Sequence, residues 1–276
     1  MRFEVEASRN WLEKPHQADA TSKIKIALLY PDLLGTYGDS GNAQILAVRA
    51  RMRGVGCELT TVNGGQAIPD DADIYVLGGG EDGPQQAAVE MARRDGGIAR
   101  AFERGAQILA ICAGFQILGE SFATAACASS AGLGLVPVVT RRGQSRRCVG
   151  ELLVDPDPAL AVPLVSCYEN HGGQSELLEG RPLGKVLVGV GNRYHGGVDG
   201  YLSDNVVASY GHGPLLARNP ALADFILARV PGAVLGPLGN QGVAEEIAAM
   251  RSERIAAARK IARAARFSSL LSRLGH

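Results

Sequence analysis

Several features that would assign the chain to a common class of protein are missing from its sequence. Lys and Arg together number 28, as do Asp and Glu, so no overall charge draws the protein toward nucleic acid or an anionic membrane. No stretch approaches the roughly 18 continuous apolar residues that a membrane-spanning helix needs. The first 22 or so residues are acidic in places and lack the apolar segment of a secretory signal. We therefore expect a cytoplasmic protein that recognises its partners locally.

The cysteines exclude two further classes. Their number is odd, and they show neither CxxC spacing nor a neighbouring pair of histidines, so a disulfide framework and a zinc site are both disfavoured. The chain also has no GxxxxGK[ST] phosphate-binding motif and no internal repeats. We expect reduced thiols and no metal. The five cysteines are Cys57, Cys112, Cys127, Cys148 and Cys167.

The pattern that is present favours an α/β fold. Apolar runs typical of buried strands alternate with helical patterns between residues 23 and 120, which indicates a mainly parallel sheet flanked by helices. Ligands bind beyond the carboxyl ends of the strands in such sheets. The predicted strands are 23–30, 57–63, 71–80 and 107–111, and the predicted helices begin at 42, 85 and 113, the second with a break at Gly96-Gly97.

The second half of the sequence differs from the first. Short β-rich runs separated by Gly, Pro and Asn follow Gly132, the last being NVVASYGHGP, and they predict an antiparallel extension of the same domain. A helix is expected at 219–229 and a basic helical pattern at 243–274, which we interpret as a solvated helix packed on the domain surface. The predicted organisation is a polar extension at 1–22, one domain at 23–230, and a linker with a helical tail at 231–276.

The segment ILAICAGFQILGE, residues 108–120, makes Cys112 a candidate nucleophile. A buried cysteine usually acts only as a small hydrophobic residue. Here, however, a strand turns directly into a helix, as at the nucleophile elbow of serine hydrolases, and Ala113 and Gly114 allow a tight turn. The thiol would then lie at a strand end, where ligands bind.

A helix N-terminus alone cannot activate this thiol. It contributes about 0.3–1 kcal/mol, at most about 2, whereas one pKa unit corresponds to about 1.4 kcal/mol. Because a free thiol has a pKa of about 8.5, a basic partner is needed. We favour His212, which follows an apolar strand pattern between two glycines, over His171; His195 remains, and His16 and His276 are poor candidates by position.

The turn GGGEDGPQQ ends the strand predicted beside that of Cys112. Its glycines, Gly79 or Gly80, would direct one backbone N–H group at a developing oxyanion, and Ala113 would supply a second. Such backbone donors matter more for catalysis than the side chains of Glu81 and Asp82, which we interpret as solvated or turn-stabilising.

Together these motifs carry a family resemblance. ICAGFQILG resembles the GxCxGxQ nucleophile motif of triad-type glutamine amidotransferases. YGHGP and GGGEDxxQ resemble the cobyric-acid-synthase-like branch. YGDSGN, RRCVGE, YENHGG and GGVDGY are most similar to the glutaminase subunits of lipid II isoglutaminyl synthase, the GatD family. The resemblance spans about residues 24–229.

The resemblance implies a flavodoxin-like class I amidotransferase fold and a glutaminase that uses Cys112 and His212 through a thioester. Arg147 matches a family arginine that binds the substrate glutamine, although it also lies in a basic run that a surface would tolerate. Gln116 would hold the substrate or cap the elbow helix. Ammonia would pass to a Mur-ligase-like (MurT-type) partner that amidates D-glutamate of the lipid II stem peptide, and that partner would hold ATP and Mg²⁺, leaving this chain without a cofactor.

Three other functions compete with this one. They are another ATP-dependent amidation such as that of cobyrinate, a cysteine hydrolase of the DJ-1/PfpI-like type, and a non-catalytic scaffold for a ligase. DJ-1/PfpI-like peptidases usually place His directly after the Cys, where this chain has Ala113.

The sequence departs from the triad family in one respect. Many members read His-Pro-Glu, where the acid orients the imidazole, but here His212 is followed by Gly213 and Pro214. The missing carboxylate would come from another residue such as Glu169, or from the partner subunit. We favour the partner, and on that hypothesis the isolated chain would be a poor glutaminase.

Overall fold

The computed structural model describes residues 23–143, 146–238 and 241–274, so the predicted extension at 1–22 lies outside the described residues. Its centre is a six-stranded sheet in the order β13-β14-β4-β3-β1-β2, in which only β13 runs antiparallel to its neighbour. Its strands are β1 (Lys23–Leu29), β2 (Gly56–Val62), β3 (Ile74–Leu77), β4 (Gln107–Ile111), β13 (Tyr201–Leu202) and β14 (Val206–Ser209).

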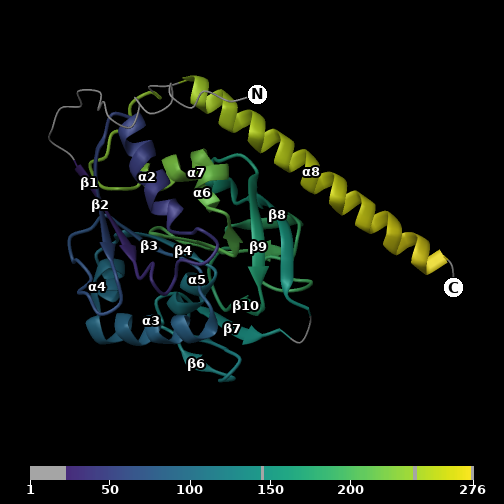
Figure 1. Cartoon of the computed structure of the whole chain (residues 1–276), viewed down its shortest axis with the longest axis horizontal. Coiled ribbons are helices and arrows are strands. Elements are labelled where there is room, and N and C mark those ends of the chain that lie inside the picture. The colour runs from purple at the N-terminus through teal and green to yellow at the C-terminus, as the bar shows by residue number, and fades with distance from the viewer. Residues whose placement is uncertain (1–22, 144–145, 239–240, 275–276) are drawn as a thin grey trace, which may run out of the picture.

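Helices cover both faces of this sheet, as its composition requires. The strands β3, β4 and β14 are buried at every position, and a strand of this kind must be covered on both sides. One face carries α2 (Gly41–Met52), α6 (Leu215–Arg218) and α7 (Pro220–Ala228); the other carries α3 (Asp82–Asp95), α4 (Gly97–Glu103) and α5 (Ala113–Leu118) (Figure 1). The predicted α/β fold is confirmed.

The predicted break between two helices is also present. Gly96 separates α3 from α4 with a φ of 73°, a left-handed conformation that glycine adopts without steric cost.

Two smaller sheets lie beside the central one. A five-stranded antiparallel sheet has the order β12-β11-β8-β9-β15, and a four-stranded sheet has the order β10-β7-β5-β6. Their strands are β5 (Ser121–Phe122), β6 (Ser130–Ala131), β7 (Val138–Arg142), β8 (Cys148–Pro156), β9 (Val165–His171), β10 (Gly173–Leu177), β11 (Gly184–Val188), β12 (Val198–Asp199) and β15 (Gly211–His212); a short 3₁₀ turn, Pro158–Leu160, follows β8.

One part of the predicted antiparallel extension is wrong. The run NVVASY does not join the extension, because β14 pairs in parallel with β4 in the central sheet, with Val206 opposite Ile108 and Ser209 opposite Ile111. All four residues of this strand are buried and the first three are apolar, which suits the interior of a parallel sheet. The chain therefore returns to the central sheet immediately before His212.

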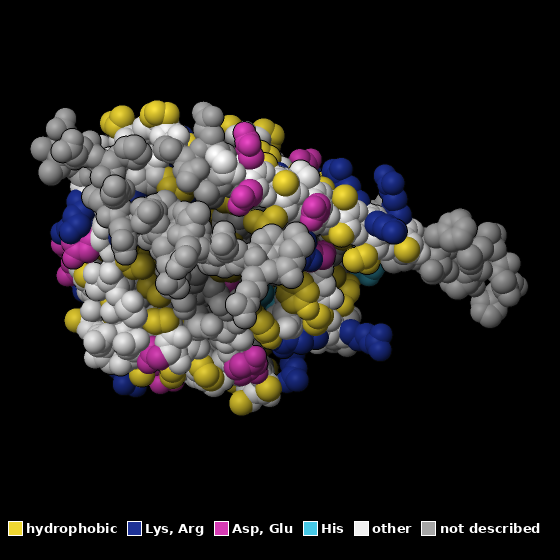
Figure 2. All heavy atoms as spheres, turned by 45° about the horizontal axis from the view of Figure 1, so that its top comes forward, with side chains coloured by type: hydrophobic (Ala, Val, Ile, Leu, Met, Phe, Trp, Pro, Cys, Tyr) yellow, Lys and Arg dark blue, Asp and Glu magenta, His cyan; other side chains and the backbone are white. Residues whose placement is uncertain are grey.

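The C-terminal helix α8 (Gln241–Leu274) packs on the domain along its first part and then projects away from it (Figure 1). Ala258 is fully buried, and the guanidinium group of Arg251 donates to the carbonyl of Leu164, whereas Met250 and Ile261 are exposed. Acidic side chains lie near the start of the helix and basic ones farther along it (Figure 2). Within the described ranges, no helix is both long and apolar enough to cross a membrane.

Candidate active site

Cys112 lies at a strained turn between β4 and α5. Its backbone has φ 51° and ψ −104°, outside the regions that a non-glycine residue normally occupies, and α5 begins at the next residue. The residue is buried to 93%, since 7% of its surface is exposed. The N–H of Gly114 donates to the carbonyl of Gly78 and holds the turn against the end of β3. The geometry is that of a nucleophile elbow.

His212 is brought to Cys112 by two sheets acting together. β14 carries the chain along β4, and β15 then pairs antiparallel with β9, with His212 opposite Tyr168. The imidazole is buried, and the ring of Tyr37 lies edge-on to it with centroids 4.9 Å apart. Within the described residues, Nε2 of His212 has no hydrogen-bond partner, so it is free to exchange a proton with a substrate.

A carboxylate on the same chain orients His212. Oδ2 of Asp39 lies 2.7 Å from Nδ1 of His212, and Asp39 is completely buried. Burial opposes a charge on the imidazole, but the hydrogen bond to Asp39 and the nearby sulfur of Cys112 outweigh it and raise the pKa of His212 to about 10. The side chains are thus arranged as a cysteine, a histidine and an aspartate in series.

This arrangement corrects both expectations about the missing acid. Glu169 does not serve, because its carboxylate accepts hydrogen bonds from the N–H groups of Val190 and Gly191 and faces His171 instead. A partner's acid is not needed either, because Asp39 already occupies the Nδ1 position of His212. The premise for a poorly active isolated chain therefore fails.

The glycine turn after β3 contributes differently from the prediction. The N–H of Gly79 donates to Oδ2 of Asp39 at 2.8 Å, so it is not available to an oxyanion. A Cβ atom at Gly79 would lie 2.6 Å from Cε1 of His212, so only glycine lets the turn approach the imidazole this closely. The N–H groups of Gly80 and Ala113 make no hydrogen bond within the described residues and border the same cavity as Cys112.

That cavity, of about 270 Å³, opens beside Cys112 and has charged groups of both signs around it. Glu81 and Asp82 border it from the start of α3, while Arg142 and Arg147 border it from β7 and the start of β8. An α-amino acid carries a carboxylate and an ammonium group side by side, and this distribution of charge complements both. The cavity is also bordered by Gly80, Ala113, Gln116, Ala123, Thr124, Ala125, Gly143, His171, Gly172 and Gly173.

Arg147 and Gln116, the two predicted substrate-binding residues, both border this cavity. Nε of Arg147 donates to Oδ1 of Asn170 at 2.5 Å and one terminal nitrogen donates to the Asn170 carbonyl at 3.2 Å, which fixes the guanidinium plane. Nε2 of Gln116 donates to the hydroxyl of Tyr210, and Oε1 accepts from Gln85. Gln116 is therefore held as part of the cavity lining rather than capping α5.

The remaining histidines lie elsewhere. His171 borders the cavity, but its Nδ1 is bonded to the carbonyl of Gly173, and His195 is exposed on a loop. His16 and His276 lie outside the described residues.

Sequence reasoning missed Asp39 and Tyr37, although both belong to the stretch TYGDSGN that carries part of the family resemblance. The motif itself was the signal in the sequence, but the structure is needed to see that this loop follows β1 and that β1 lies next to β3. The loop after β1 therefore meets the Gly79 turn.

Comparisons with known proteins agree with this geometry. A model of the CobB/CobQ-like glutamine amidotransferase domain matches residues 25–220. The GatD subunit of lipid II isoglutaminyl synthase (glutamine-hydrolyzing) from Staphylococcus aureus is 31% identical over 198 residues, which cover 71% of this chain and 79% of that protein. The corresponding subunit from Streptococcus pneumoniae is 32% identical over 208 residues, covering 73% of this chain and 78% of that protein.

Two further matches are more distant. A cobyric acid synthase from Sphingopyxis alaskensis is 32% identical over 187 residues, but these cover only 35% of that longer protein. A crystal structure of a glutamine amidotransferase superposes with a TM-score of 0.50 at 17% identity, covering 74% of this chain and 98% of that one. At this identity the structural likeness concerns the fold alone.

Proposed function

Because the chain belongs to the CobB/CobQ-like glutamine amidotransferase family and, within it, to the GatD subunits, we propose that it hydrolyses glutamine at Cys112 and passes the ammonia to a synthase subunit. The observation that carries the proposal is the buried series Cys112, His212 and Asp39 beside a cavity suited to an amino acid. ATP and Mg²⁺ would be held by the partner.

The chemistry begins at the elbow. The sulfur of Cys112 attacks the side-chain amide carbon of glutamine, and the carbonyl oxygen becomes an oxyanion next to the N–H groups of Ala113 and Gly80. The protonated His212 gives its Nε2 proton to the departing nitrogen, which leaves as ammonia and yields a γ-glutamyl thioester on Cys112. Asp39 keeps the imidazole in the orientation that this transfer needs.

Water completes the cycle. His212, now neutral, takes a proton from a water molecule whose oxygen attacks the thioester carbon. The C–S bond breaks, glutamate leaves, and the proton returns the site to its starting state with a protonated His212. The net reaction converts glutamine and water into glutamate and ammonia.

The α-amino acid end of glutamine would be recognised at the far end of the cavity. The α-carboxylate would lie against the guanidinium group of Arg147, which can form two parallel hydrogen bonds to it. The α-ammonium group would lie toward Glu81 and Asp82, whose role we now assign to the substrate rather than to solvation alone.

The acceptor is proposed from the relatives. The two bacterial proteins with which the chain shares most of its length are named as subunits of lipid II isoglutaminyl synthase. We therefore propose a Mur-ligase-like partner that uses ATP to activate the D-glutamate carboxylate of the lipid II stem peptide. Cobyrinate is the competing acceptor, supported by the shorter match to cobyric acid synthases.

A reconstitution tests both parts. The chain is mixed with a candidate Mur-ligase-like subunit, ATP, Mg²⁺, glutamine and lipid II, and amidated product is measured for the wild type, Cys112→Ala and His212→Ala. Both variants should lose amidation from glutamine and regain it with ammonium salts. Glutamine-dependent amidation by either variant would refute the catalytic assignment, whereas glutamine hydrolysis without lipid II amidation would refute only the acceptor.

A further inference from the structure

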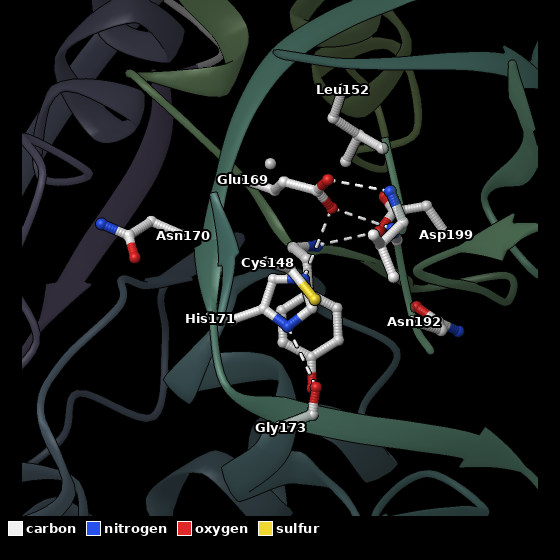
Figure 3. A network of polar contacts seen from close by, with 12 residues as sticks. Cys148, Leu152, Glu169, Asn170, His171, Gly173, Asn192 and Asp199 are labelled. Atoms are coloured by element: carbon white, nitrogen blue, oxygen red, sulfur yellow. Dashed lines mark hydrogen bonds and ion pairs between the residues drawn. The ribbon is translucent and has the colours of Figure 1, made fainter. Parts of the chain in front are cut away.

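Glu169 and His171 form a second buried acid–histidine pair, separate from Asp39 and His212. Both residues lie on β9, two positions apart, so their side chains leave the strand on the same face. Figure 3 shows the Glu169 carboxylate pointing toward two backbone N–H groups and toward the imidazole of His171, while the other ring nitrogen of His171 points toward Gly173. The side chains are 3% and 1% exposed.

The hydrogen-bonding partners of His171 define its protonation. Nδ1 lies 3.0 Å from the carbonyl oxygen of Gly173, which can only accept, so Nδ1 carries a proton. Nε2 lies 3.5 Å from Oε2 of Glu169 and makes no hydrogen bond within the described residues. The ring is thus held between the Gly173 carbonyl and the Glu169 carboxylate.

The pair is connected to the cavity through two routes. His171 holds the carbonyl of Gly173, and the backbone of Gly172 and Gly173 borders the cavity. The imidazole also stacks on Tyr210 with centroids 3.8 Å apart, and the Tyr210 hydroxyl accepts from the side-chain amide of Gln116.

The residues along these two routes are tightly packed. A Cβ atom at Gly173 would lie 2.4 Å from Nε2 of Gln116, so the cavity backbone and the Gln116 amide are in direct contact. A movement of the Gly173 carbonyl would therefore displace Gln116, and the cavity would change shape. Among the hydrogen bonds of the described residues, none joins Gly173 or Tyr210 to Asp39 or His212.

We propose that Glu169 and His171 are positioning residues for glutamine binding, acting through the Gly172–Gly173 backbone and Tyr210, and that they do not take part in the bond-breaking steps. The inference rests on the proposed glutaminase function and deepens it. Loss of the pair should weaken binding of glutamine more than the reactivity of Cys112.

The test compares two electrophiles at the same thiol. Iodoacetamide reaches Cys112 without needing the amino acid subsite, whereas acivicin, an amino acid electrophile, must bind like glutamine. The variants are His171→Phe, which keeps a ring to stack on Tyr210, and Glu169→Gln, which keeps the side-chain size. His195→Phe makes the same chemical change on an exposed loop and serves as the matched control.

The expected result is a rise of about tenfold or more in the KM for glutamine, with kcat within about threefold of wild type, because the contacts that hold the Gly173 carbonyl and the His171 ring in place are lost. The acivicin rate should fall by a similar factor while the iodoacetamide rate is unchanged, and the control should match wild type. If His171→Phe does not fold, as judged by circular dichroism, Glu169→Gln must show the same separation of rates.

Two results would overturn the inference. One is an unchanged KM and acivicin rate in folded variants. The other is an equal fall in kcat and in both rates of alkylation, which would place the pair in the activation of Cys112. A wild-type chain that neither hydrolyses glutamine nor is protected by it from acivicin would instead overturn the proposed function and this inference with it.

Discussion

Replacing Asp39 by Asn should severely reduce glutamine hydrolysis while leaving the cavity intact. Asp39 makes two contacts through Oδ2, accepting from Nδ1 of His212 and from the N–H of Gly79. An asparagine has the same shape but carries no charge. If its amide nitrogen faces the imidazole, the ring must accept at Nδ1 and adopt the opposite tautomer, with its proton on the nitrogen that should act as a base.

The size of the expected fall in kcat follows from the hydrogen bond that is lost. A hydrogen bond to a charged group contributes about 1.5–3 kcal/mol, which corresponds to roughly a 10- to 150-fold fall in kcat. The wrong tautomer adds to this, and in the serine-protease triad the equivalent substitution lowers kcat by about 10⁴. We therefore expect a fall of at least about 100-fold, with a much smaller change in the KM for glutamine, because Asp39 does not border the cavity.

The assay is glutamate release by the isolated chain, followed from pH 6 to pH 10. The hydrogen bond that His212 donates to Asp39 is a main cause that raises the pKa of His212 to about 10, so the variant should lose its imidazolium ion at a lower pH. Asp204→Asn is the matched control, since the Asp204 side chain is fully exposed. Activity of Asp39→Asn within about twofold of wild type would refute the assignment, as would an equal loss in the control.

Three further predictions concern the cavity and its supports. Gly79→Ala should lower kcat about 100-fold, because the added Cβ displaces the imidazole of His212; glutamate release measures this. Arg147→Lys should raise the KM for glutamine about tenfold, because lysine cannot hold Asn170 and a carboxylate with a planar fork. Asp199→Asn should flatten the dependence of stability on pH. Burial raises the pKa of Asp199 from 3.8 to about 6, so the folded chain binds this proton more tightly than the unfolded chain, and stability falls by about 3 kcal/mol as the pH rises from about 4 through 6. Urea unfolding at several pH values measures that slope.

Each of these has a comparison that can contradict it. Gly83→Ala places a Cβ in open space near the same loop and should retain activity, so an equal loss there would remove the steric explanation. For Arg147→Lys, a fall in kcat at constant KM would oppose a role in binding. For Asp199→Asn, a slope between pH 4 and 6 as steep as that of wild type would show that another group titrates there.

The sequence predicted those parts of the site that are local in the chain. Cys112, Ala113 and the glycine turn each follow a recognisable strand, and a strand end in an α/β sheet is a binding position. Asp39 was not found, because its contact with His212 joins residues 173 positions apart and depends on the strand order. The placement of β14 was wrong for the same reason, since a short apolar run does not indicate which sheet it will join.

The sequence also could not predict which partner each polar group of the site bonds to. Gly79 was expected to face an oxyanion, but its N–H is taken by the carboxylate that had not been recognised. Glu169 was weighed as the orienting acid because it is a nearby carboxylate on the strand of YENHGG, yet its side chain leaves β9 on the face of His171.

The pairing of β14 with β4 makes the site depend on a late part of the chain. A chain that has been synthesised only through α5 contains Asp39 and Cys112 but lacks His212. His212 is made only after four of the five strands of the antiparallel sheet and after β14, because it lies in β15, the last strand of the described chain. A chain that ends before His212 should therefore not hydrolyse glutamine, and the onset of ammonia release should report that synthesis and folding have passed this residue.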